Sequence, residues 1–155
     1  MDFLEQTQRE RVVNIAKEYL GTPYHNCGRV KGAGVDCLTF LAGVFEEAGL
    51  VPALEIPKYS PQWHLHQGGE KYLEGLLQYT KPVLKPQMGD IALFRFGRTY
   101  SHAAIVIEWP QIIHSWYSTG CVLDDAEANQ QFAFIGEAAA DQGKPRPKKF
   151  FSYWY

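Results

Sequence analysis

Cys37 is the residue whose place in the sequence most favours covalent chemistry. It follows Asp36, a residue type preferred at the N-cap, and it opens a segment with helical periodicity. Backbone N–H groups and the helix dipole at such a position stabilise a thiolate, the form of cysteine that attacks carbonyl carbons. Cysteine is also among the most often buried residue types, so an inert core thiol is an equally open interpretation from position alone.

Two histidines in the second half of the chain could supply the base that such a thiol requires. If residues 108–110 form a three-residue hairpin loop, Ala104 lies opposite His114, and His102 lies two positions before Ala104 on the same face. The histidines are then diagonal neighbours with Cα atoms about 7 to 8 Å apart. We therefore predict that His102 takes the thiol proton and that His114 fixes the tautomer of His102.

The other histidines fit this chemistry less well. His64 and His66 lie in an irregular segment, with no thiol or carboxylate at an informative spacing, and are interpreted as surface residues. A zinc site made of His25, Cys27 and Cys37 is an alternative use of the thiol. The gaps of one and nine residues between these three do not match the usual paired Cys-x-x-Cys arrangement. The sequence therefore predicts neither a metal nor a cofactor.

Helices are predicted mainly in the first half of the chain. Apolar side chains recur at helical spacing over 5–20 and over 37–48, and a glycine follows each segment. Between them, residues 24–35 contain three glycines and no periodicity, which indicates a surface loop. A short third helix is expected over 69–79.

Strands are predicted in the second half, where short apolar segments rich in β-favouring residues follow Gly89. The expected strands cover 91–96, 102–108, 112–116, 121–123 and 132–137, and the aromatic end of the chain forms a last strand or a docked patch. Helices followed by an antiparallel sheet are typical of the α+β class. We expect one domain over 1–155.

Composition narrows the classes of function. The net charge is −2, without a long run of one sign, which argues against nucleic-acid binding. The apolar runs are far shorter than the roughly 20 residues of a membrane span. The first residues are polar and acidic, unlike a secretory signal, so we expect synthesis in the cytoplasm without a signal peptide. Three cysteines, an odd number, argue against a disulfide framework.

Five motifs together give the chain a family resemblance. It contains, in this order, LGTPYHNCG, GAGVDCLTFLAGVFEEAG, MGDIALF, SHAAIVIE and IIHS. This pattern, over roughly residues 10–125, resembles the NlpC-type cell-wall peptidases, a papain-like family of bacterial and phage cysteine hydrolases. The closest resemblance is to the branch found with phage tails and prophages, where Asp-Cys-Leu is common. It implies a papain-like α+β fold, with the nucleophile at a helix N-terminus packed on a C-terminal antiparallel sheet.

The resemblance assigns roles to five residues. It implies that Cys37 is the nucleophile, His102 the general base and His114 the third polar residue of the site. Tyr24, in the Pro-Tyr pair, would line the substrate cleft, and Asp36 matches a position that helps to hold a substrate amine in some members. No metal is needed for this scheme.

Other positions depart from the family pattern or match no catalytic position. Leu38 replaces a serine found in members that trim free stem peptides, which favours cleavage within longer wall peptides. Cys27 and Cys121 match no catalytic position and are interpreted as structural thiols. Residues 51–80 form a predicted insertion, in which three aromatic residues could either roof the cleft or serve as ordinary packing: Tyr59, Trp63 and Tyr72.

The resemblance implies hydrolysis of an amide bond in the peptide stem of bacterial peptidoglycan. The expected bond joins the side-chain carboxyl of D-glutamate to the next diamino acid. The expected partners are stem peptides and phage tail proteins, with action at the cell wall as part of a phage particle. The alternative is a non-hydrolytic wall-binding or tail module of the same fold, and the presence of Cys37, His102 and His114 together argues against it.

Overall fold

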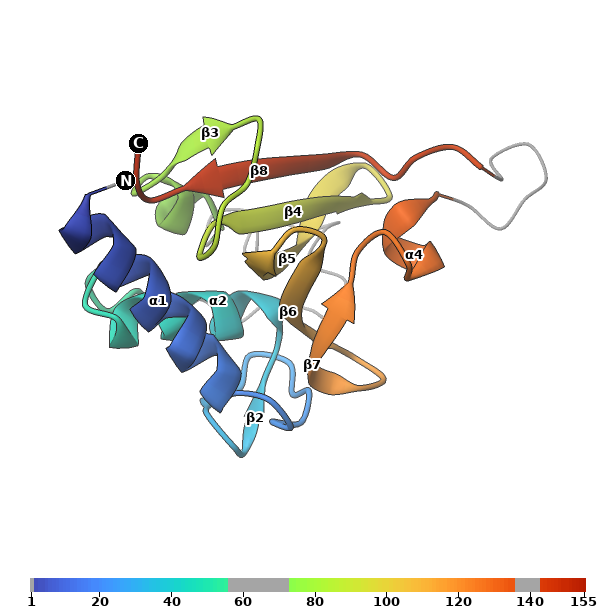
Figure 1. The fold of residues 1–155 in the computed structure, drawn as a ribbon. Coiled ribbons are helices and arrows are strands. Elements are labelled where there is room, and N and C mark those ends of the chain that lie inside the picture. The colour runs from blue at the N-terminus through green and yellow to red at the C-terminus, as the bar shows by residue number, and fades with distance from the viewer. Residues whose placement is uncertain (1, 56–72, 136–142) are drawn as a thin grey trace.

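Helices and a sheet segregate in space as they do in the sequence. In the computed structural model, which describes residues 2–55, 73–135 and 143–155, two long helices pack beside a six-stranded antiparallel sheet (Figure 1). The elements are α1 (Phe3–Glu18), β1 (Arg29–Val30), β2 (Gly34–Val35), α2 (Cys37–Glu47), β3 (Lys81–Val83), β4 (Ile91–Phe96), β5 (Thr99–Glu108), β6 (Gln111–Trp116), β7 (Gly120–Asp125), α4 (Gln130–Ala133) and β8 (Lys148–Ser152). The strand order is β3-β8-β4-β5-β6-β7. The predicted α+β class is confirmed.

The two long helices begin and end at the signals that the sequence contains. The side chain of Asp2 caps α1 by accepting the Glu5 N–H, and Asp36 caps α2 in a capping box with Thr39. Gly49, just beyond α2, has φ +75°, a conformation that favours glycine. α2 is the more buried helix, because most of its side chains lie in the core.

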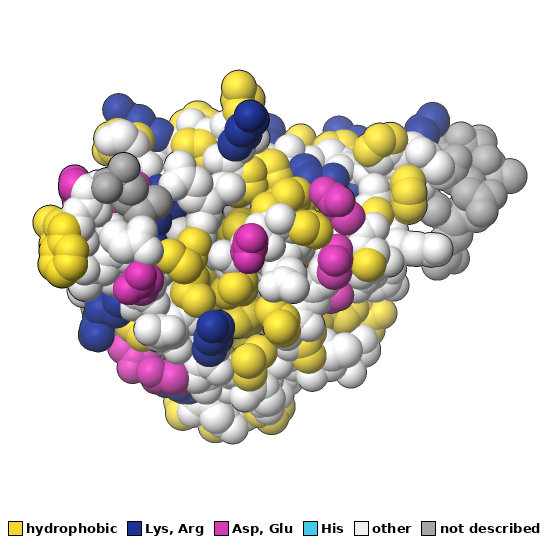
Figure 2. Space-filling model, in the orientation of Figure 1, with side chains coloured by type: hydrophobic (Ala, Val, Ile, Leu, Met, Phe, Trp, Pro, Cys, Tyr) yellow, Lys and Arg dark blue, Asp and Glu magenta, His cyan; other side chains and the backbone are white. Residues whose placement is uncertain are grey.

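The sheet separates two groups of buried side chains, since successive residues of a strand point to opposite faces. The helix-side core joins α1 and α2 to strand residues such as Leu93, Ala103 and Ile105. The far-side core consists of Ala92, Phe94, Ala104, Val106, Ile112, Ala126 and Phe132. The surface view in Figure 2 shows hydrophobic side chains gathered near the middle of one face, with charged side chains of both signs scattered around them.

The hairpin between β5 and β6 differs from its prediction at the turn. Glu108 pairs with Gln111, so the loop has two residues instead of three, and Val106 pairs with Ile112. A bulge at Ile107 accounts for the one-residue difference. Before the bulge, Ile105 pairs with Ile113, so this part of the hairpin has the predicted register.

Other sequence-based expectations were wrong or lie outside the described residues. The strand expected over 132–137 is wrong at 132–133, because these residues form the end of α4, which Asn129 caps. Phe134 forms an isolated antiparallel bridge with Pro145, and residues 136–137 are not described. The loop over 24–35 contains the β1-β2 ribbon. A helical segment covers 73–77 of the expected third helix. Outside the described residues are much of the predicted insertion and the side chains of Tyr59, Trp63, His64, His66 and Tyr72. The single-domain interpretation stays a prediction.

Among the described helices, none combines the length and the apolar character needed to cross a membrane.

Candidate active site

Cys37 is the first residue of α2, and its sulfur faces the backbone of β5. The thiol lies 3.8 Å from the carbonyl oxygen of Ser101, and the N–H of Ala103 donates to the sulfur. Ser101 lies where the register between β4 and β5 shifts, a bulge that changes the direction of the chain locally. The nucleophile candidate therefore lies against the main chain on both sides of His102, and its side chain is buried.

The two histidines are in direct contact, as the register predicts. His102 Nε2 lies 2.8 Å from His114 Nδ1, and the ring planes are nearly perpendicular at 87°. The second nitrogen of His114, Nε2, lies 3.0 Å from Asp124 Oδ2. Three side chains from β5, β6 and β7 thus form a continuous hydrogen-bonded chain.

Asp124 was missed by the sequence analysis, although a signal for it exists. In the β6-β7 register, His114 pairs with Val122, which makes Asp124 a diagonal neighbour of His114. Predicting the contact between Asp124 and His114 requires the β6-β7 register. This register depends on the turn between the two strands and on the residue at which β7 begins.

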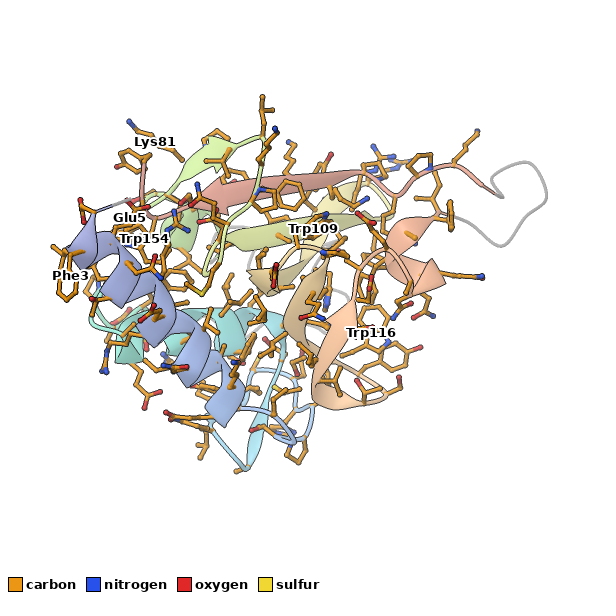
Figure 3. All side chains as sticks on the ribbon, in the orientation of Figure 1. Phe3, Glu5, Lys81, Trp109, Trp116 and Trp154 are labelled. Carbon is orange, nitrogen blue, oxygen red and sulfur yellow. The ribbon has the colours of Figure 1, made fainter. Side chains whose placement is uncertain are left out.

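Aromatic side chains surround the two imidazole rings. Trp116, labelled in Figure 3, has its ring centroid 4.9 Å from that of His102. Phe132 of α4 contacts both rings, at 5.2 Å from His102 and 4.9 Å from His114. The histidine rings thus pack with the far-side core, while Cys37 belongs to the helix-side core. Among the described residues, no hydrogen bond links the Cys37 sulfur to either ring.

Burial dominates the electrostatics of Cys37. It raises the pKa of the thiol to about 12, and the neighbouring carboxylate of Asp36 acts in the same direction. The backbone N–H groups of Ala103, Cys37 and Leu38 lower it, so the helix-start effect expected from the sequence is present but outweighed. The resting sulfur is a protonated thiol.

Burial also keeps both imidazoles uncharged. It is the main cause that holds the pKa of His102 well below its usual range, with smaller contributions from His114 and Arg146. Burial likewise lowers the pKa of His114, against the opposing effect of Asp124. A neutral imidazole can accept a proton, so the candidate nucleophile and the candidate base are both uncharged at rest.

Tyr24 lies next to the start of α2. It forms an isolated bridge with Val35. Its pKa is raised by burial and then by the nearby Cys37 and Asp36, so the phenol keeps its proton and can donate a hydrogen bond. This placement is compatible with the predicted cleft position.

Asp36 has a clear structural task. Its Oδ1 accepts the N–H groups of Leu38 and Thr39, and its Oδ2 accepts the N–H of Cys27. These bonds hold the N-terminus of α2 and the preceding loop in place around the thiol. Binding of a substrate amine by Asp36 stays a prediction.

Of the remaining thiols, Cys121 is buried in the helix-side core. Burial raises the pKa of Cys121 to about 11. Within the described parts of the chain, no group of three or more His, Cys, Asp or Glu side chains is arranged to hold a metal ion, so the zinc alternative with His25, Cys27 and Cys37 finds no support there.

Comparisons with known proteins identify the family and the fold. The model of the NlpC/P60 family matches residues 21–132. No curated protein sequence matches the chain. Among solved structures, the chain is similar to the NlpC/p60 domain of the peptidoglycan hydrolase SagA, with 20% identity, a TM-score of 0.55 and coverage of 91% of this chain and 96% of that one.

Two further structures share the fold. An NlpC/P60 family protein from Bacillus cereus is 24% identical with a TM-score of 0.55; the match covers 80% of this chain but only 37% of the longer Bacillus protein. RipD from Mycobacterium tuberculosis, a non-catalytic NlpC/p60 domain protein adapted to peptidoglycan binding, is 14% identical with a TM-score of 0.50, over 79% of this chain and 90% of that one. At these identities the likeness concerns the fold alone.

Proposed function

Because the chain belongs to the NlpC/P60 family, we propose that it is a cysteine peptidase acting on the peptide stems of bacterial peptidoglycan. In this proposal Cys37 is the nucleophile, His102 is the general base and His114 orients His102. The observation that carries it is the 2.8 Å contact between the two imidazoles, on the strand whose backbone holds the Cys37 sulfur.

The proposed reaction has two steps. In the structure the His102 ring packs with the far-side core, and no described hydrogen bond joins it to the Cys37 sulfur, so the reaction requires the ring and the thiol to come within hydrogen-bond distance first. The thiol then gives its proton to His102 while the sulfur bonds to the amide carbon, and the carbonyl oxygen becomes an oxyanion. The intermediate then collapses, the C–N bond breaks and the leaving amine takes the proton from His102. Water, deprotonated by His102, attacks the resulting thioester and releases a carboxylate and the free thiol.

The oxyanion needs hydrogen-bond donors close to the sulfur. The backbone N–H of Cys37 and the hydroxyl of Tyr24 are our candidates, and one such donor typically contributes about 3 kcal/mol to transition-state stabilisation. The raised pKa of Tyr24, due first to burial, favours this role because the phenol keeps its proton.

The finer assignment follows the sequence motifs. We propose that the bond cleaved joins the side-chain carboxyl of D-glutamate to the next diamino acid, at the cell wall and as part of a phage or prophage tail. The Asp36-Cys37-Leu38 sequence supports the phage-associated branch, and Leu38 favours cleavage within longer wall peptides over recognition of a free amine.

A non-hydrolytic wall-binding module is the second candidate. Two observations favour this candidate. Burial raises the pKa of the Cys37 thiol to about 12. The fold is also similar to that of RipD. A binding module would retain peptidoglycan without changing the masses of its peptides.

Mass spectrometry of purified muropeptides, before and after incubation with the chain, tests the two candidates. For a peptidase we expect product pairs whose masses add up to the substrate plus one water, and the fragment masses identify the bond. Cys37→Ala should lose this turnover while keeping its far-ultraviolet circular dichroism. Cys121→Ser, which changes a buried thiol outside the proposed machinery, is the matched control. Unchanged muropeptides that co-sediment with the wild-type chain would instead support the binding module.

A further inference from the structure

Asp124 receives hydrogen bonds from three directions. Its Oδ2 accepts from the Asn129 side chain at 2.8 Å and lies 3.0 Å from His114 Nε2. Its Oδ1 accepts the backbone N–H of Asp125 at 2.8 Å. The carboxylate is therefore held in a fixed orientation beside the second histidine.

These contacts determine which nitrogens carry protons. A carboxylate only accepts hydrogen bonds, so His114 Nε2 must carry a proton. In the neutral imidazole, His114 Nδ1 is then an acceptor, and the proton in the 2.8 Å contact must come from His102 Nε2. His102 Nδ1 is left as the one unprotonated nitrogen of that ring, the state that a general base requires.

We infer that Asp124 is a positioning residue that sets the tautomers of both His114 and His102, so that His102 Nδ1 is free to take the thiol proton. The inference deepens the proposed function and rests on it for the role of His102 as the base. Asp124 acts through His114 and touches neither the substrate nor the sulfur in this scheme.

The surroundings keep Asp124 charged for this task. Burial opposes the charge, but the hydrogen bonds from Asn129 and His114 outweigh it and lower the pKa of the carboxylate. Asn129 also caps α4 through its Oδ1, which accepts the Gln131 N–H. The same short helix supplies Phe132, which packs on both imidazoles. α4 therefore fixes the carboxylate and the rings together.

Nitrogen-15 NMR of the imidazole side chains tests the inference on the wild-type chain. At a pH where both rings are neutral, we expect His102 and His114 both to carry the proton on Nε2. A proton on Nδ1 of either ring would overturn the inference. This measurement needs no substrate and no variant, so it gives an answer whether or not Asp124 variants fold.

Asp124→Ala should remove the control of both tautomers. No carboxylate then accepts the proton on His114 Nε2, so this proton can move to His114 Nδ1, and His102 can then carry its own proton on Nδ1. We expect kcat for muropeptide cleavage to fall about 10²- to 10⁴-fold, by analogy with the loss of tautomer control in serine protease triads, with KM within about twofold.

Asp125→Asn is the matched control, because the Asp125 side chain accepts only the Glu127 and Ala128 N–H groups among its described contacts, and asparagine can do the same. It should keep wild-type tautomers and kcat. An Asp124→Ala chain that keeps the proton of both rings fully on Nε2 would contradict the inference. If the wild-type chain shows the expected tautomers but cleaves no muropeptide, the proposed function fails while the assignment of Asp124 as the group that sets the tautomers stands.

Discussion

The resting charges of Cys37 and His102 follow from where their side chains are buried. A helix N-terminus alone favours a thiolate, but the sulfur here is enclosed and lies next to the Asp36 carboxylate, so its pKa is raised to about 12, chiefly by burial. His102 is kept neutral by the same cause. In the proposed mechanism the proton therefore moves during the attack, when a substrate carbonyl is in place, and not before it.

This view predicts how Cys37 reacts with iodoacetamide. The sequence argument alone predicts labelling well below a pH of about 8.5, because a helix-start thiol loses its proton easily. From the buried thiol we expect slow labelling near pH 7 and a rate that rises about tenfold per pH unit up to about pH 9, since the thiolate fraction rises in that proportion. Peptide mass spectrometry after timed labelling measures it, with buried Cys121 as the internal comparison. A rate plateau below about pH 7 would show a preformed thiolate.

The histidine pair could be predicted because strand alternation converts sequence spacing into geometry. The twelve-residue separation of His102 and His114 across one hairpin places both rings on one face, and a wrong loop length did not matter because the bulge at Ile107 compensates. Asp124 and the aromatic contacts could not be predicted in this way. They depend on a second register and on α4, whose last two residues, Phe132 and Ala133, begin an apolar run that is equally compatible with a strand.

A buried ion pair, which the sequence pattern did not reveal, adds to the apolar contacts between α1 and the sheet. Arg9 Nη1 lies 2.8 Å from Asp90 Oδ1, and both side chains are only 2% exposed. The same guanidinium donates to the Met88 carbonyl and lies 4.4 Å from the ring centroid of Trp154, labelled in Figure 3. The aspartate of the Gly-Asp motif before β4 thus has a structural role as the partner of Arg9. The aromatic end of the chain is docked as expected, because Trp154 packs on the same guanidinium.

Removing one partner of this pair should destabilise the whole chain. Arg9→Ala leaves the Asp90 carboxylate buried without its cation, and we expect a loss of about 3 to 5 kcal/mol in the free energy of unfolding. Urea denaturation followed by circular dichroism measures it. Arg11→Ala, two residues along α1 on the exposed side, should change stability by less than about 0.5 kcal/mol. Equal effects of the two substitutions would contradict this role for Arg9.

At the scale of the whole molecule, the candidate site lies where the two cores meet. α2 brings Cys37 to β5 from the helix side, while α4 and the aromatic side chains hold the histidines on the far side (Figure 1). β5 contributes to both cores, because successive residues such as Ala103 and Ala104 point to opposite faces of the sheet. The order of helices and strands could be predicted from the spacing of apolar residues and from the β-favouring segments. The distribution of the candidate site over both faces of the sheet could not be predicted, because it depends on how the sheet packs against elements remote in sequence.

Burial of two neutral imidazoles in the far-side core makes the stability of the molecule sensitive to mild acid. In the unfolded chain a histidine takes up a proton below a pH of about 6.5, whereas burial keeps His102 and His114 unprotonated to lower pH in the fold. The unfolded state then binds more protons, so the contribution of the two histidines to stability is constant above about pH 7 and falls as the pH decreases below about 6.5.

Each histidine that stays neutral in the fold contributes a slope of up to about 1.4 kcal/mol per pH unit in this window. We therefore expect the Tm to decrease from about pH 6.5 downwards and His102→Gln to flatten the decrease, whatever its own stability at neutral pH. His25→Gln, at an exposed position, should leave the slope unchanged. Differential scanning calorimetry over about pH 5 to 8 measures both. A Tm that rises on acidification would contradict this prediction, because it would mean that the folded state binds more protons than the unfolded state. Two neutral histidines enclosed by aromatic rings cannot bind protons without local opening of the fold.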